Sequence, residues 1–152
     1  MNIILPWRLK SLEHKNRILG KLGEMHQYLK ELEEMLPTER EYIQNTLSRR
    51  GCEKTAELCI ECVINIISMI VSYNKFGMPQ SEDDLIRILV SRKVLSEKLG
   101  VIISKMKSFR NRLVHKYGEI DHHKAYQSMS SELEDFSLFE QEIKEYLKNS
   151  KK

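Results

Sequence analysis

The sequence contains few of the residues that interrupt helices. Only 6 glycines and 3 prolines occur among its 152 residues, and strand-rich folds need more turn residues than this. The hydrophobic share of 41% and the charged share of 31% fit one domain built around a single core. We therefore expect an all-α protein.

Aromatic residues and net charge are also low, which narrows the range of partners. An aromatic share of 7% argues against a wide base-stacking platform. The net charge of +3 permits a polyanionic partner without requiring one, because the charges are spread along the chain rather than gathered in a block.

Cysteines and long apolar runs are scarce as well. The only three cysteines, Cys52, Cys59 and Cys62, fall within one expected helix, and an odd number at this spacing indicates a reducing compartment rather than a disulfide framework. The apolar run before Pro6 lacks the charged region of a signal peptide. Since no run approaches about 18 uncharged apolar residues, we expect no membrane span and a cytoplasmic protein.

Apolar periodicity and capping residues predict five helices. Pro37 ends the first helix, and Thr38 with Glu41 forms a capping box that opens the second. Ser81 and Ser96 are suited to cap the next two, and Asp121 the last. We expect the helices over about 8–36, 38–74, 81–94, 96–117 and 121–148.

These helices predict a single domain over residues 1–152. Four are long enough to form an up-and-down four-helix bundle, and the helix that begins at Ser81 is an additional short one. The last helix is expected to pack its apolar residues inward. Its lysine tail, at about 149–152, is expected to fray.

One residue in the stretch KMKSFRNRLVHKYGEID, residues 105–121, does not fit this pattern. At about 100° per residue, Arg110 falls near the middle of an apolar stripe. Burying a guanidinium costs on the order of several kcal/mol unless it is paired or faces a partner. This arginine therefore needs an explanation beyond the core.

The same stretch resembles a known signature. Arg110 and Asn111, then His115, then Tyr117 stand at the spacing Arg-x-x-x-x-His-x-Tyr, which is similar to the motif of the HepT-like toxins, a branch of the HEPN-domain ribonucleases. The resemblance extends along most of the chain. Arg112 and Lys116 depart from the family pattern by adding positive charge, which bears on RNA contacts.

The resemblance implies a metal-independent endoribonuclease toxin without a cofactor. Such an enzyme cuts RNA through attack of a neighbouring 2′-hydroxyl, which needs a proton-transfer group with a pKa near 7 and a cation for the phosphate. These roles fall to His115 and Arg110, respectively. Asn111, one turn before His115, is placed to orient its ring.

The resemblance also implies regulation by a partner. HepT-like toxins are typically encoded beside a minimal nucleotidyltransferase antitoxin, which transfers AMP to the motif tyrosine, here Tyr117. An adduct that carries a phosphate beside Arg110 would occupy the cleft and compete with RNA. The alternative is that Tyr117 simply packs as the last aromatic residue of its helix.

The geometry of a single helix raises an objection to this site. Arg110 and His115 point about 140° apart on a straight helix. They converge if the helix ends at about Val114, or if two copies of the motif meet across a two-fold axis. The resemblance implies the second arrangement, a homodimer with a shared RNA cleft, in which the apolar stripe around Arg110 is partly an interface.

Three further interpretations stay open. Glu53, at the edge of the second helix's apolar stripe, is either a partner of Arg110 or a solvated flank residue. His122 and His123 beside Asp121, together with His115, suggest a metal site, although adjacent side chains on a helix diverge by about 100°. Finally, the chain is either a ribonuclease or a non-catalytic partner subunit that binds a nucleotidyltransferase or nucleotide through Arg110 and Tyr117.

Overall fold

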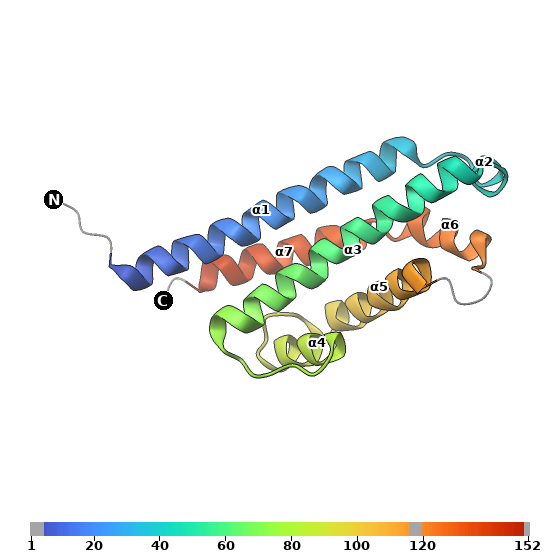
Figure 1. Ribbon diagram of the computed structural model, residues 1–152. Coiled ribbons are helices and arrows are strands. Elements are labelled where there is room, and N and C mark those ends of the chain that lie inside the picture. Colours follow the sequence, from blue (N-terminus) through green and yellow to red (C-terminus); the bar gives the residue numbers. More distant parts are fainter. Residues whose placement is uncertain (1–4, 116–119, 151–152) are drawn as a thin grey trace.

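The computed structural model describes residues 5–115 and 120–150. Within these ranges, all of its secondary-structure elements are helices. The long helices α1, α3, α5 and α7 form the predicted bundle, and α4 is the additional short helix (Figure 1). Their bounds are α1 Pro6–Met35, α2 Glu39–Gln44, α3 Thr46–Asn74, α4 Glu82–Ser91, α5 Glu97–His115, α6 His122–Ser131 and α7 Glu134–Asn149.

The predicted helix starts are confirmed by their caps. Thr38 Oγ1 accepts a hydrogen bond from the Glu41 amide at 3.3 Å, and Ser81 Oγ accepts one from the Asp84 amide at 3.2 Å. Ser96 Oγ likewise accepts from the Leu99 amide. Each cap satisfies an amide that the first turn of a helix leaves without a partner. The cap at Ser81 fixes where α4 begins.

Two of the expected helices are each broken in two. Asn45 stops α2 and caps α3, since its side chain accepts from the Ser48 amide at 3.0 Å. The last helix breaks between α6 and α7, where the hydroxyls of Ser130 and Ser131 both bond to the carbonyl of Gln127. Such side chains compete with the backbone for helical hydrogen bonds. The single helices expected over 38–74 and 121–148 were therefore wrong.

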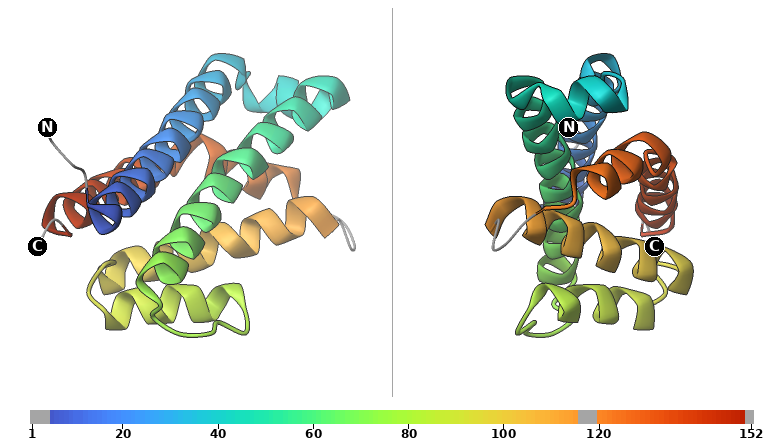
Figure 2. Two further views of the ribbon diagram at one scale, coloured as in Figure 1. Left: turned by 60° about the vertical axis from the view of Figure 1, so that its left-hand side comes forward. Right: turned by 90° about the vertical axis from the view of Figure 1, so that its right-hand side faces the viewer.

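Helix α3 is the centre of the molecule. It lies along α1, and it also packs against α4 and α5 (Figures 1 and 2). It is long and apolar enough to cross a membrane by length and composition alone, but 61% of its most apolar 18-residue window is buried inside the bundle. That burial is typical of a core helix. The cysteines belong to this core, and burial raises the pKa of the Cys59 thiol to about 12.

A pair of glycine substitutions tests the packing of α4 on α5. A Cβ at Gly100 would lie 2.8 Å from Val90 Cγ2, whereas one at Gly23 would meet nothing within 4 Å. Alanine gains about 1 kcal/mol of helix propensity at either position. Because the β-branched Val90 is stiff, overpacking costs about 1–3 kcal/mol and outweighs that gain at Gly100. We expect Gly100→Ala to lower, and Gly23→Ala to raise, the free energy of unfolding in urea.

Candidate active site on helix α5

Arg110 is buried inside its own chain and is fully paired. Its residue exposure is 8%, and its guanidinium bridges three helices. Nη1 lies 2.6 Å from Glu61 Oε1 on α3, and Nη2 donates to Glu82 Oε1 on α4. Nε donates to Asn111 Oδ1 at 3.0 Å. The two carboxylates explain why a guanidinium stands in an apolar stripe, so no second chain is needed to account for its burial.

The positions of the two carboxylates that pair with Arg110 follow from the helices that carry them. Glu61 lies on the side of α3 that faces α5, and Glu82 is the first residue of α4, directly after the Ser81 cap. Burial opposes the charge on Arg110, but its hydrogen bonds to Glu61 and Glu82 more than compensate and raise the pKa of the guanidinium above its ordinary value. Arg110 therefore remains a cation in the fold.

Glu53 is not the partner of Arg110, so this possibility is corrected. Its Oε1 lies 3.8 Å from Arg49 Nε, one turn earlier on α3, and its residue exposure is 6%. Arg49 in turn donates to the carbonyls of Tyr42 and Ile43 at the end of α2. Glu53 is thus neither a solvated flank residue nor part of the site. Together with Arg49 it holds the junction between α2 and α3.

His115 lies at the end of α5 and is exposed. Helix α5 ends at this residue, close to the end at about Val114 that one alternative expected, and His115 is still within the helix. Arg110 and His115 therefore point to different sides of the same helix within one chain. Val114, expected in the apolar stripe, is 45% exposed. Tyr117, where the helix was expected to end, lies outside the described residues.

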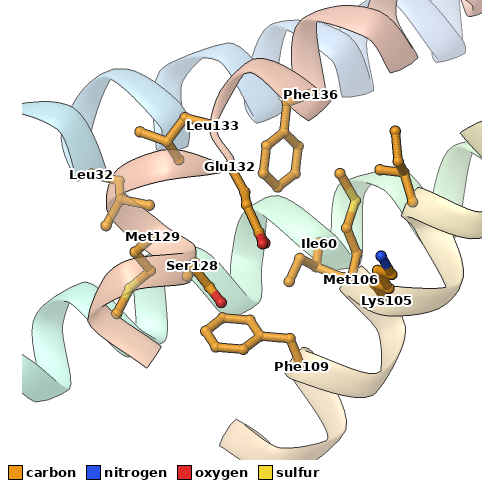
Figure 3. A pocket seen from close by; sticks show the side chains of 12 residues that line it. Leu32, Ile60, Lys105, Met106, Phe109, Ser128, Met129, Glu132, Leu133 and Phe136 are labelled. Carbon is orange, nitrogen blue, oxygen red and sulfur yellow. The ribbon is translucent and has the colours of Figure 1, made fainter. Parts of the chain in front are cut away.

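The outer face of α5 borders a groove against α6. Lys105, Ser108 and Arg112 line it from α5, and Ser128 and Glu132 line it from the other side. A smaller apolar cavity of about 50 Å³ lies beneath it, between Met106, Phe109 and Phe136 (Figure 3). The groove thus sits on the same helix as His115 and away from the buried side of Arg110.

The metal interpretation of the histidine pair gains no support. His123 Nδ1 bonds to Glu39 Oε1 at 2.9 Å, and His122 stacks edge-on against Tyr42. Within residues 5–115 and 120–150, no three His, Cys, Asp or Glu side chains are grouped so that they could hold a metal ion.

Glu61 and Glu82 were missed by sequence reasoning. The Ser81 cap was a usable signal for Glu82, because it fixes this residue in the first turn of a helix next to the motif helix. Choosing Glu61 over Glu53 needed the register between α3 and α5, which periodicity alone does not give.

Comparison with known proteins defines the class. A family model described as ribonuclease HepT-like matches residues 25–143. The chain belongs to this family of HepT-like ribonucleases.

Sequence relatives match most of this chain, and a solved structure has the same fold. The chain is 24% identical to an mRNA nuclease HepT of Shewanella oneidensis, over 84% of this chain and 96% of that protein. It is 26% identical to a tRNA nuclease HepT of Aphanizomenon flos-aquae, over 70% and 73%. A tri-AMPylated Shewanella oneidensis HEPN toxin, solved in complex with an MNT antitoxin, superimposes with a TM-score of 0.79 at 24% identity, over 84% and 96%.

The burial of Arg110 predicts that it supports the fold as well as any chemistry. Arg110→Ala leaves two carboxylates facing each other without their cation, and we expect a loss of about 2 kcal/mol in the free energy of unfolding. The loss is smaller than for a fully buried pair, because Glu61 and Glu82 stay 38% and 36% exposed. His115→Ala, at the exposed helix end, should cost less than about 1 kcal/mol. Equal losses in urea unfolding would contradict this assignment.

Proposed function

We propose that this protein is a metal-independent endoribonuclease toxin of a toxin–antitoxin pair. The observation that carries the proposal is the Arg-x-x-x-x-His-x-Tyr spacing of Arg110, His115 and Tyr117, with His115 exposed at the end of α5, within the segment that matches the ribonuclease family. The relatives named as mRNA and tRNA nucleases support RNA as the substrate class.

In this proposal His115 is the general acid/base of the reaction. It takes a proton from the attacking 2′-hydroxyl or gives one to the leaving 5′-oxygen. The bond between phosphorus and that 5′-oxygen breaks as the bond from the 2′-oxygen forms, which leaves a 2′,3′-cyclic phosphate. Asn111, one turn earlier, has its Oδ1 already engaged by Arg110 Nε, so only its amide nitrogen is left to orient the ring of His115 in this proposal.

Arg110 supplies the charge for the phosphate only by exchanging partners. Its guanidinium is held by Glu61 and Glu82, so a phosphate has to replace one of these carboxylates. Arginine's fork suits either anion. A homodimer in which two α5 helices meet across a two-fold axis brings His115 of one copy toward Arg110 of the other, and it removes the divergence that one helix imposes.

The proposed regulator is a minimal nucleotidyltransferase that transfers AMP to Tyr117. The solved complex of a tri-AMPylated HEPN toxin with an MNT antitoxin supports this modification and this partner. Tyr117 follows His115 by two residues, so an adenylyl group there would place a phosphate and a base close to the catalytic histidine. Charge and bulk would then exclude RNA.

One observation favours a second candidate, the non-catalytic partner subunit. Arg110 already has two carboxylate partners, as a purely structural arginine would. In that case the motif helix serves to dock a nucleotidyltransferase rather than to cut RNA.

Cleavage of RNA in EDTA distinguishes these two functions. Purified protein with an unmodified Tyr117, verified by mass, is incubated with total RNA beside the His115→Ala variant. We expect cleavage by the parent with cyclic phosphate ends, and a loss of about 100-fold or more in the variant, which is the usual contribution of a general acid/base. Arg110→Lys, which keeps the charge but not the fork, should retain the fold and lose most of the cleavage.

Two results would contradict the proposal. The first is that the parent does not cleave RNA although Tyr117 is unmodified, which would favour the docking subunit. Alternatively, His115→Ala would cleave as fast as the parent, which removes His115 from the chemistry.

A further inference from the structure

The cationic side chains of helix α5 lie on two sides of the helix. On the inner side, Lys107 Nζ lies 2.5 Å from Asp83 Oδ1, and Arg110 is held by its two carboxylates. On the outer side, Lys98, Lys105 and Arg112 are exposed. None of these three forms an ion pair with any residue in the described part of the chain. They therefore offer unneutralised charge to a partner.

The outer cations form a straight row that leads to His115. Lys98, Lys105 and Arg112 follow one another at seven-residue intervals, which places them on one face, about 10.5 Å apart along the helix. His115 comes three residues after Arg112, about 60° round the helix, which makes it the neighbour of Arg112 at the end of the row. The row and the histidine thus form one continuous track.

The groove between α5 and α6 lies along this track and has a volume of about 250 Å³. Lys105 and Arg112 border it, and the hydroxyls of Ser108 and Ser128 also reach it. Phe109 contributes an aromatic ring, with the Arg112 guanidinium 5.9 Å from the ring centroid. Cations beside an aromatic ring are the usual means of holding single-stranded nucleic acid.

Glu132 is an unexpected acid in a groove bordered by cations. It reaches into the space between Phe109 and Phe136 (Figure 3), and its carboxylate has no hydrogen-bonding side chain among the residues described. A carboxylate repels a phosphate but accepts hydrogen bonds from the exocyclic amino group of a base. Its position fits the base rather than the backbone of a nucleotide.

We propose that the outer face of α5 is the RNA-binding track of the proposed ribonuclease, on which this inference rests. Lys105 and Arg112 contact backbone phosphates, and one base lies over Phe109 with its amino edge toward Glu132. The track selects bases that carry an exocyclic amino group over uracil. Arg112 and Glu132 thereby become binding and specificity residues, distinct from the chemistry of Arg110 and His115.

Binding is measured by fluorescence anisotropy with labelled short oligo(C) in EDTA. All proteins carry His115→Ala, so that the RNA stays intact. Against this background, the double variant Lys105→Gln, Arg112→Gln is compared with the matched variant Lys144→Gln, Lys148→Gln on the exposed side of α7. Both remove two charges, so any difference between them reports position rather than net charge.

We expect the α5 variant to bind about tenfold more weakly at low salt. The slope of log K against log salt should shrink by about 0.7 for each phosphate contact removed from a single strand. The α7 variant should match the His115→Ala protein in both quantities. Equal RNA affinities and salt slopes for the two double variants, or no RNA binding by the His115→Ala protein, would contradict the proposal that this face binds RNA.

The base preference is tested with oligo(C) and oligo(U), whose bases differ in an amino group against a carbonyl at the same position. We expect oligo(C) to bind about five- to tenfold more tightly, and Glu132→Gln, which can donate as well as accept, to remove most of the difference. A preference unchanged by Glu132→Gln would overturn the role of Glu132.

These outcomes are separable from the proposed catalysis. If the α5 cations bind RNA but the His115-intact protein does not cleave it, the ribonuclease proposal fails and the RNA-binding face stands. If the intact protein cleaves while the Lys105 and Arg112 substitutions leave binding unchanged, the track fails and the ribonuclease stands.

Discussion

The guanidinium of Arg110 and the carboxylates of Glu61 and Glu82 form the interaction on which the site depends. It joins α5 to both α3 and α4 at a point where each helix would otherwise meet an apolar surface. An uncompensated charge there would cost on the order of several kcal/mol. The network therefore fixes the rotation of α5, and that rotation decides which residues of this helix are buried and which face solvent.

Once that rotation is set, α5 has two distinct faces. The inner face is neutralised, because Lys107 and Arg110 both meet acidic groups of the first turn of α4. The outer face keeps its charge and ends at His115. The short helix α4, which also contributes Leu85, Ile86 and Leu89 to the core, thus determines the electrostatics of the motif helix. The close contact between Gly100 and Val90 serves the same arrangement, since it allows α4 to approach α5.

Sequence reasoning recovered what depends on local chemistry. Caps at Thr38, Ser81 and Ser96 and the heptad-like apolar stripes gave the bundle and the start of each of those helices. It failed where the structure depends on contacts between helices, or where a continuous and a broken helix differ little in free energy. The break at Asn45 needs the Arg49 bridge to the end of α2, and the choice of Glu61 over Glu53 is a shift of two turns along α3. A periodic pattern fixes the face of a helix but not its axial register against a neighbour.

The divergence of Arg110 and His115 has a consequence for any ribonuclease built on this fold. Because α5 stays helical through His115 and Arg110 is anchored from two sides, neither residue can swing to the other without unwinding the helix or breaking the network. A second copy related by a two-fold axis avoids unwinding the helix, since it supplies each missing group from a helix that remains intact, and it leaves only the exchange of one Arg110 carboxylate for the phosphate. The same anchoring that stabilises the single chain therefore makes the proposed active site a property of the pair.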